Sequence, residues 1–343
     1  MRAAVIHAAK DLRIDNVETP PLGDGEVEVR IEAGGICGSD LHYYLHGGFG
    51  TVRIKEPMIL GHEIAGTIAR VGRNVRDRTP GQRVAVNPSQ PCGHCRYCAE
   101  GKQNHCLDMR FYGSAMRFPH VQGGFRDVLV CDAAQAIPVG PTTSAAQAAF
   151  AEPLAVCLHA VNRAGPLLGK RVLVTGAGPI GALTVIAARY AGASEIVATD
   201  IADAPLATAK RIGADAVINV AKADALAAFT ADKGTFDVMF EASGSGVALA
   251  SSFAVVRPRG IIVQIGVGGE VSIPLNVAVA KEFDLRGTFR FHEEFALAVD
   301  LIDRRRVDVM PLLTTTVPLA KARDAFELAA DRSRAMKVQL SFA

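Results

Sequence analysis

The segment RVLVTGAGPIGALTVIAARY, residues 171–190, joins a short apolar run, a glycine-rich turn and a longer apolar stretch. The run RVLVT is typical of a strand buried on both faces of a parallel sheet, because such strands are apolar at nearly every position. The stretch after the turn has the length of a helix. A strand, a glycine turn and a helix in this order predict the first βα unit of a dinucleotide-binding fold.

The glycines of this turn have the spacing G-x-G-x-x-G. The first permits a tight turn, the second lets the backbone approach a pyrophosphate, and the third lets the helix pack closely on the strand. The helix N-terminus adds a partial positive charge that favours anions. A glycine turn of another α/β domain is the alternative. We expect the phosphates of a dinucleotide to be bound by Gly176, Gly178, Pro179, Ile180 and Gly181.

Asp200 ends the next apolar segment, EIVATD (195–200), at the distance from the turn where an acidic residue reaches a ribose 2′-OH. Its carboxylate would repel a 2′-phosphate, and residues 201–204 offer no arginine to bind one. We therefore expect NAD to be preferred over NADP. Gly266, which ends the segment GIIVQIG (260–266), is expected to contact the nucleotide as well.

The pattern of apolar segments changes along the chain. From about 170 to 288, apolar strand segments alternate with helical segments at the spacing of βαβ units. Residues 1–150 show short apolar alternations separated by turn signals, which indicate irregular β-structure with long loops. Residues 289–343 are mixed and end in a strand-like segment. We predict an α/β protein: a β-rich domain of residues 1–150 and 289–343, and an inserted, doubly wound parallel-sheet domain of residues 151–288.

The composition argues against several classes of protein. A net charge of +2 over 343 residues indicates neither a nucleic-acid partner nor a membrane surface. The N-terminal residues lack the apolar core of a signal peptide. Residues 172–188 are uncharged, but their glycines and proline suit a strand, turn and helix better than a membrane span. The seven cysteines show no secreted disulfide framework, which favours the reducing cytoplasm.

Four of those cysteines lie within PCGHCRYCAEGKQNHC, residues 91–106. The spacing Cys92-x2-Cys95-x2-Cys98-x7-Cys106 suits four sulfur ligands around one tetrahedral metal ion. Four sulfur ligands leave zinc no open position, so we expect a structural zinc that performs no chemistry. An iron–sulfur cluster, two disulfides and free thiols are the alternatives.

A catalytic metal would need ligands elsewhere, and two segments offer them. Cys37 lies in GICGSDLH (35–42), and His62 and Glu63 lie in GHE (61–63). One thiolate, one imidazole and one or two carboxylates would give zinc a site with an open position. Taken singly, a cysteine after an apolar strand is usually a core residue, and a histidine before a glutamate usually lies at the surface.

Together and in this order, the motifs resemble those of the zinc-dependent medium-chain alcohol and polyol dehydrogenases, and within them the sorbitol dehydrogenase branch. The motifs are GGICGSDLH (34–42), GHE (61–63), the four-cysteine loop and GAGPIG (176–181), and the resemblance covers essentially the whole chain. It implies a GroES-like catalytic domain, a Rossmann domain, two zinc ions per subunit, NAD, and a homo-oligomer, either a tetramer or a dimer.

The resemblance also implies roles for single residues. Cys37, His62 and Glu63 would be ligands of the catalytic zinc. Glu152 stands where alcohol dehydrogenases of this family carry a second cysteine ligand, so it would bind the zinc directly or through a water. Ser39 and His42 match the positions of a proton relay. The residues that match the lining of the polyol pocket are Tyr43, Arg290 and Phe291.

The loop segments RIKEPMILGHE (53–63) and DMRFYGSAMRFPHVQGGF (108–125) are similar to those of dehydrogenases that oxidise the sugar acid L-idonate to 5-keto-D-gluconate. A guanidinium suits a carboxylate in charge and geometry. Arg110, Arg117 and Arg290, with His120, lie in segments expected to face the pocket, and we hypothesise that Arg110 or Arg117 binds the carboxylate; a solvated or structurally paired arginine is the alternative. Sorbitol, xylitol and L-threonine are alternative substrates. A catalytically inactive NAD-binding relative is the alternative from another class, although such relatives typically lack the metal ligands.

Overall fold

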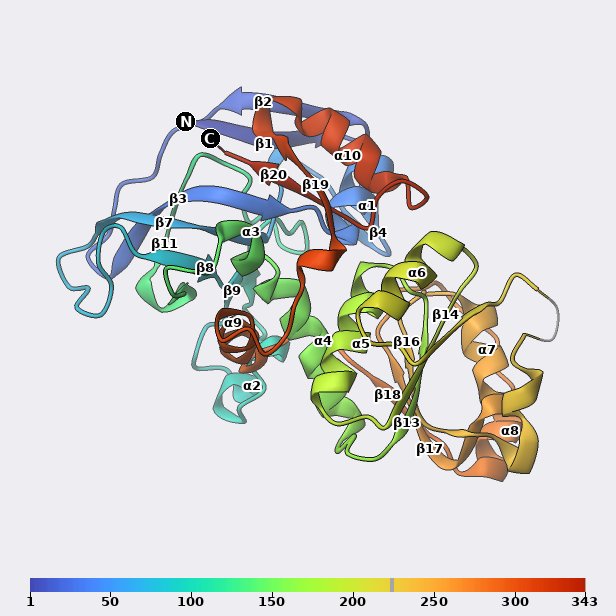
Figure 1. Cartoon of the computed structure of the whole chain (residues 1–343). Helices are drawn as coiled ribbons and strands as arrows, with labels where there is room; N and C mark the ends of the chain where they lie inside the picture. Colours follow the sequence, from blue (N-terminus) through green and yellow to red (C-terminus); the bar gives the residue numbers. More distant parts are fainter. Residues whose placement is uncertain (223–224, 343) are drawn as a thin grey trace. The chain divides into compact units, whose positions relative to one another are not determined.

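The computed structural model describes residues 1–222 and 225–342, and the chain divides into two compact units (Figure 1). The first unit comprises Met1–Glu152 and Phe295–Ala343, and the second comprises Pro153–Glu294. The domain boundaries expected from the sequence, after 150 and before 289, differ from these by a few residues. The reason is that helix α4 (Ala151–Ala164) begins in the first unit, and helix α9 (Glu294–Asp303) begins where the second unit ends.

The first unit is built on a seven-stranded sheet of order β12-β8-β7-β3-β20-β19, in which β11 also pairs with β3. Its core includes Ile31, Leu60, Phe125 and Phe326, which are almost completely buried. The strands of this sheet are β3 (Glu26–Gly35), β7 (Glu63–Val71), β8 (Arg83–Val86), β11 (Val128–Asp132), β12 (Ala136–Pro138), β19 (Leu313–Pro318) and β20 (Lys337–Ser341).

Smaller elements complete the first unit. A three-stranded sheet has the order β2-β1-β6, and two short antiparallel pairs join β4 to β5 and β9 to β10. These strands are β1 (Arg2–Ala8), β2 (Asp11–Asn16), β4 (Gly48–Phe49), β5 (Val52–Arg53), β6 (Met58–Ile59), β9 (Ser89–Gln90) and β10 (Arg110–Phe111). The helices, apart from α9, are α1 (Gly38–His46), α2 (Arg96–Ala99), α3 (Ala145–Ala148) and α10 (Ala322–Ala330).

The second unit is a six-stranded parallel sheet of order β15-β14-β13-β16-β17-β18. Counted from β13, this is the order 3-2-1-4-5-6 of a doubly wound fold. Helices α5 and α6 lie on one side of the sheet, and α7 and α8 lie on the other (Figure 1). The predicted fold class is therefore confirmed. The bounds are β13 (Arg171–Thr175), α5 (Pro179–Tyr190), β14 (Glu195–Asp200), α6 (Asp203–Arg211), β15 (Ala216–Asn219), β16 (Phe236–Glu241), α7 (Gly246–Val255), β17 (Val256–Gln264), α8 (Leu275–Lys281) and β18 (Asp284–Gly287).

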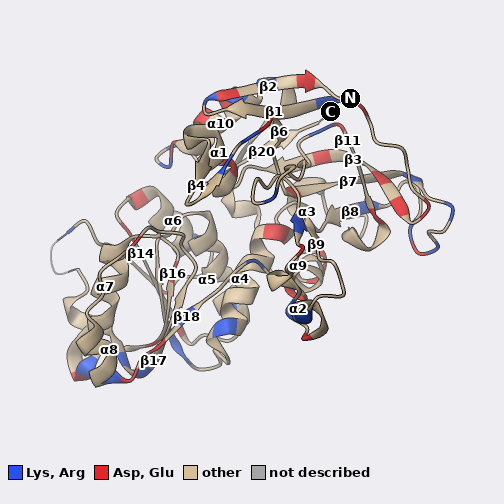
Figure 2. Cartoon of the chain, turned by 180° about the vertical axis from the view of Figure 1, so that it is seen from behind, with Lys and Arg blue, Asp and Glu red and all other residues tan. Residues whose placement is uncertain are grey.

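Two features of the sequence, the uncharged stretch 172–188 and the low net charge, can be located in the structure. Residues 172–188, the uncharged stretch, form most of β13, the glycine turn and most of α5. Within residues 1–222 and 225–342, no helix combines the length and apolar character needed to cross a bilayer. Figure 2 shows basic and acidic residues intermixed along both units, in keeping with the net charge of +2.

Glu294, at the first position of α9, joins the end of the second unit to α4. One of its carboxylate oxygens, Oε1, accepts hydrogen bonds from His159 Nδ1 and Asn162 Nδ2, both at 2.9 Å, and Oε2 accepts one from the backbone N–H of His292 at 3.0 Å. Burial alone would raise the pKa of Glu294, but these donors more than offset burial and lower the pKa to about 2.

Because the folded-state pKa of Glu294 lies below the ordinary value of 4.5, its contribution to stability is present above pH 4.5 and is lost as the pH falls towards 2. We expect Glu294→Gln to lower the free energy of unfolding by about 2 kcal/mol at pH 7, after allowance for solvent screening. The difference should shrink steadily between about pH 5 and pH 2. Denaturant titrations at several pH values measure it, with the exposed neighbour substitution Glu293→Gln as control. A difference that stays constant over this range would contradict the assignment.

Candidate metal centres and nucleotide site

The pairing of β3 with β7 brings the predicted metal ligands together. These strands are antiparallel, and Gly35 at the end of β3 is paired with Glu63 at the start of β7. Cys37 follows β3 by two residues, and His62 immediately precedes β7. One donor atom from each of Cys37, His62 and Glu63 lies within 4.8 Å of the others, and the histidine and glutamate side chains are buried.

This donor set fits a zinc ion. Thiolate, imidazole and carboxylate are the ligand types that zinc takes in proteins. His62 Nδ1 is buried and makes no hydrogen bond within the described residues, and the nearest carboxylate oxygen, Asp40 Oδ1, lies 3.8 Å away. Leaving a buried polar nitrogen unpartnered is unfavourable, and a metal ion bound directly to Nδ1 would remove that penalty. Three protein ligands leave zinc an open fourth position, as catalytic zinc sites do.

Asp40 holds this site together, although the sequence analysis gave it no role. Its side chain is completely buried on the first turn of α1. Oδ2 accepts a hydrogen bond from the backbone N–H of Cys37 at 3.0 Å, and Oδ1 accepts one from the backbone N–H of Gly61 at 3.2 Å. One carboxylate therefore fixes the two loops that carry the sulfur and the imidazole. Its place at the third helical position is where capping carboxylates occur, so a sequence signal was available.

A buried lysine is the second residue that the sequence analysis missed. The side chain of Lys337 is 4% exposed, and its ammonium group donates to Glu63 Oε1 at 2.6 Å and to the backbone oxygen of Ile36 at 3.1 Å. It also lies 2.5 Å from Glu63 Oε2. The site therefore contains a fixed positive charge that comes from the first residue of β20.

Glu152, near the start of α4, is buried beside the same group. Burial raises its pKa to about 8, and the charges of His62 and Glu63 also act on it. Its carboxylate oxygens do not belong to the set of donor atoms within 4.8 Å. Glu152 therefore lies beside the three-residue donor set and is not part of it.

Helix α1 carries the three predicted residues that follow Cys37. Ser39 lies in its first turn, two residues after Cys37. His42 is exposed, and its ring lies 5.9 Å from that of Phe49. Tyr43 is buried instead, and its hydroxyl accepts a hydrogen bond from the backbone N–H of Ala115 at 3.0 Å.

The arginines proposed for the substrate carboxylate lie in different surroundings. Arg117 pairs with Asp108 at 2.5 Å. Arg110 is exposed, whereas its neighbour Phe111 is buried with its ring 5.5 Å from that of His62. Because successive side chains of a strand point to opposite faces, Arg110 points away from His62.

The remaining pocket candidates are placed as follows. His120 is held in the first unit, where its Nδ1 donates to the backbone oxygen of Arg117 and its Nε2 accepts from the backbone N–H of Lys55. Both ring nitrogens are thus occupied by the backbone. Arg290 and Phe291 belong to the second unit. Arg290 adopts a left-handed backbone conformation, φ 54°, and its guanidinium lies 4.9 Å from the ring of Phe289; Phe291 is buried.

The four-cysteine loop forms a second, separate cluster. The sulfur atoms of Cys92, Cys95, Cys98 and Cys106 lie within 4.8 Å of one another, with Cys95 Sγ 3.6 Å from Cys98 Sγ and 3.9 Å from Cys106 Sγ. Ligands at about 2.3 Å from a tetrahedral zinc are about 3.8 Å apart, whereas disulfide sulfurs are about 2.05 Å apart. Cys106 Sγ also accepts backbone hydrogen bonds, as metal-bound thiolates do. The sulfur geometry fits a closed zinc site.

The glycine turn has the predicted strand–turn–helix context. Gly176 has φ 81°, and a Cβ at Gly181 would lie 1.7 Å from the backbone oxygen of Gly176, so the last position admits only glycine. Asp200 Oδ2 accepts a hydrogen bond from the backbone N–H of Ala177 at 2.7 Å, which places the acidic residue against the turn. Gly266 is equally confined, since a Cβ there would lie 2.2 Å from the backbone nitrogen of Gly244. The free N-terminus of α5, with Gly178 as its cap and Pro179 and Ile180 in its first turn, can receive a phosphate.

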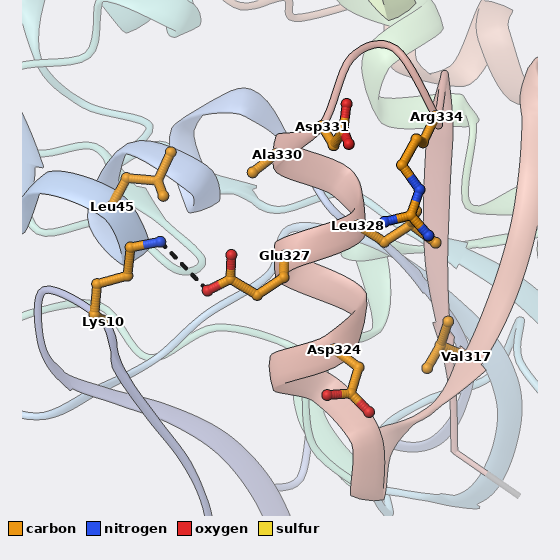
Figure 3. A pocket seen from close by; sticks show the side chains of 9 residues that line it. All are labelled: Lys10, Leu45, Val317, Asp324, Glu327, Leu328, Ala330, Asp331 and Arg334. Carbon is orange, nitrogen blue, oxygen red and sulfur yellow. Dashed lines mark hydrogen bonds and ion pairs between the residues drawn. The ribbon is translucent and has the colours of Figure 1, made fainter.

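An open hollow of about 820 Å³ on the first unit is unrelated to these sites (Figure 3). It lies against α10, and Lys10 forms an ion pair with Glu327 across it at 3.3 Å. Its lining residues are Lys10, Leu45, Val317, Asp324, Glu327, Leu328, Ala330, Asp331 and Arg334, which include none of the predicted site residues.

Comparisons with known proteins agree with this geometry. The family model described as "Alcohol dehydrogenase GroES-like domain" matches residues 23–141, and "Zinc-binding dehydrogenase" matches residues 179–304. L-idonate 5-dehydrogenase (NAD(P)(+)) of Escherichia coli is 45% identical, over 92% of this chain and 91% of its own length. Sorbitol dehydrogenase of Bacillus subtilis is 36% identical, over 96% and 93%. The crystal structure of the E. coli L-idonate 5-dehydrogenase matches with a TM-score of 0.96 at 42% identity, covering 99% of this chain and 97% of that chain.

Because the two clusters share no residue, we expect each to hold its own zinc ion. The variant Cys37→Ser should retain one zinc per subunit where the wild-type protein binds two, since it loses one of three ligands from the open site but none from the four-cysteine loop. Metal analysis by mass spectrometry after dialysis measures the ratio. Cys131→Ala, which removes a buried thiol outside both clusters, is the control. Two zinc ions retained by Cys37→Ser would contradict the assignment.

Proposed function

Since the chain belongs to the zinc-dependent medium-chain alcohol and polyol dehydrogenases, we propose that it oxidises L-idonate to 5-keto-D-gluconate with NAD as hydride acceptor. The observation that carries the chemistry is the convergence of Cys37, His62 and Glu63 around one point with an open position. The substrate rests on the likeness to L-idonate 5-dehydrogenase over nine-tenths of the chain. The presence of all three ligands argues against a catalytically inactive relative.

Oxidation of the alcohol removes a proton from its hydroxyl group and a hydride from the carbon that carries it, and different groups of the site act on each. Zinc bound by Cys37, His62 and Glu63 supplies Lewis acidity that lowers the pKa of a substrate hydroxyl. NAD supplies the nicotinamide that accepts the hydride. Ser39 accepts the hydroxyl proton and passes it outwards, and His42, three residues later on the same helix and exposed, receives it. Partial burial, followed by the charges of His46 and Arg332, lowers the pKa of His42, so its imidazole is a free base near neutral pH.

Arg290 is our candidate for binding the substrate carboxylate, because it matches a pocket position of the polyol dehydrogenases. Of the two arginines of the 108–125 loop, Arg117 pairs with Asp108 and Arg110 points away from His62. Tyr43 and Phe291, each buried within its own unit, are kept as pocket candidates because they match pocket positions of the family.

The proposal extends to cofactor preference, assembly and compartment. Asp200 supports NAD over NADP, since its carboxylate lies against the glycine turn where a 2′-phosphate would be repelled. Family membership supports a homo-oligomer, either a tetramer or a dimer. The metal-binding arrangement of four unbridged thiols supports a reducing compartment, the cytoplasm.

The substrate is tested by steady-state rates with L-idonate, sorbitol, xylitol and L-threonine, each with NAD and with NADP. Sorbitol is the second candidate, because sorbitol dehydrogenases share about a third of the sequence over nearly the whole chain. We expect kcat/KM with NAD to be highest for L-idonate.

The variant Arg290→Met should lower kcat/KM for L-idonate about 10- to 100-fold while changing sorbitol oxidation little, because a charged hydrogen bond contributes about 1.5–3 kcal/mol. Equal efficiency with sorbitol and L-idonate would contradict the carboxylate assignment.

The proton relay is tested at Ser39. We expect Ser39→Ala to lower kcat about 10²- to 10⁴-fold, the range for a positioned acid–base group, with zinc content and NAD affinity unchanged. Ser39→Thr keeps a hydroxyl at this position and serves as the matched control. If turnover in Ser39→Ala matched the wild-type value across the pH range, the relay would have to run through another group.

A further inference from the structure

Lys337 places an ammonium group inside the metal centre, in contact with one of its ligands. Glu63 is one of the three residues whose donor atoms converge, and both of its carboxylate oxygens lie within 2.6 Å of Lys337 Nζ. We propose that Lys337 is a built-in counter-cation, which holds Glu63 when zinc is absent and competes with zinc for that carboxylate. The inference rests on the metal site proposed above.

Burial explains why Glu63 needs such a group. Its side chain is almost completely buried, and a buried carboxylate without a partner is strongly unfavourable. The ammonium of Lys337, which is buried as well, supplies that partner.

Hydrogen bonds hold both the backbone and the ammonium group of Lys337 in place. Strand β20 pairs with β3, with Gln339 opposite Gly35, and Ile36 donates its backbone N–H to the oxygen of Val338 at 3.0 Å. Lys337 Nζ in turn donates to the backbone oxygen of Ile36. The ammonium is thus tied to the strand end that precedes Cys37, and the same sheet register fixes Glu63.

The consequence is a competition between two cations for one carboxylate. In the metal-free protein, Glu63 gives its oxygens to Lys337. In the zinc-bound protein, it shares them with an ion of twice the charge, which also repels the ammonium across a short distance. Lys337 therefore stabilises the metal-free state more than the zinc-bound state, and it lowers the affinity of the site for zinc.

The experiment measures zinc affinity and metal-free stability in the same variants. Zinc bound per subunit is determined over a series of chelator-buffered free zinc concentrations, and the melting temperature is measured after removal of the second zinc. Lys337→Met removes the charge and keeps the apolar stem, whereas Lys337→Arg keeps a positive charge at the position. Lys321→Met, on the surface of the first unit, is the control.

For Lys337→Met we expect the second zinc to bind about 10- to 100-fold more tightly, the range over which groups around metal ligands change affinity. We expect its metal-free form to melt about 5 °C or more below the wild type, because Glu63 is left buried without a partner. Lys337→Arg and Lys321→Met should resemble the wild type in both measurements. A lysine that only supported the fold would not produce these opposite changes.

Zinc affinity that is unchanged or weakened in Lys337→Met would overturn the counter-cation role while leaving the metal site in place. If the wild-type protein itself never took up a second zinc, the proposed metal site would fail instead, so the two failures are distinguishable. Should Lys337→Met fold only with zinc present, the double variant Lys337→Met/Glu63→Gln provides the second measurement. Removing both charges should restore the metal-free melting temperature, and failure to restore it would count against the pairing.

Discussion

The antiparallel pairing of β3 with β7 is the interaction on which the site depends. It places Gly35 opposite Glu63, so that the loop after one strand and the loop before the other meet at one edge of the sheet. The sulfur and the imidazole approach each other for that reason, and Asp40 then bonds to the backbone of both loops. A shift of one residue in this register would turn Glu63 to the other face of the sheet and separate the ligands.

The two metal centres are built in opposite ways. The four sulfur ligands come from one loop of sixteen residues, so few backbone torsions have to be ordered to assemble them. The open site instead draws on strand ends, a helix start and the last strand of the chain, and most of its groups are buried. A closed site made from one loop is suited to holding a structure, whereas a site made from several rigid elements can keep ligands close together and still leave a position open.

The sequence predicts those parts of the molecule that local patterns control. Residues 171–190 specify a strand, a tight turn and a helix, and Gly181 has room for no side chain. The metal ligands could be named because their motifs resemble those of a known family. The role of Lys337 could not be predicted, because it lies 274 residues from Glu63 in the sequence. An isolated lysine in a strand does not indicate which carboxylate it pairs with. That Arg110 or Arg117 binds the carboxylate stays a prediction, and the ion pair of Arg117 with Asp108 and the alternation of β10 appear only in three dimensions. Asp40 could have been found from its capping position.

The place of Lys337 near the end of the chain also bears on how the protein matures. Cys37, His62 and Glu63 are synthesised early, but β20 emerges from the ribosome only after the whole parallel-sheet unit has been made. The ion pair between Lys337 and Glu63 can therefore form only after the second unit has been synthesised. Of the groups that contact this carboxylate, the ammonium is the last to be added to the chain.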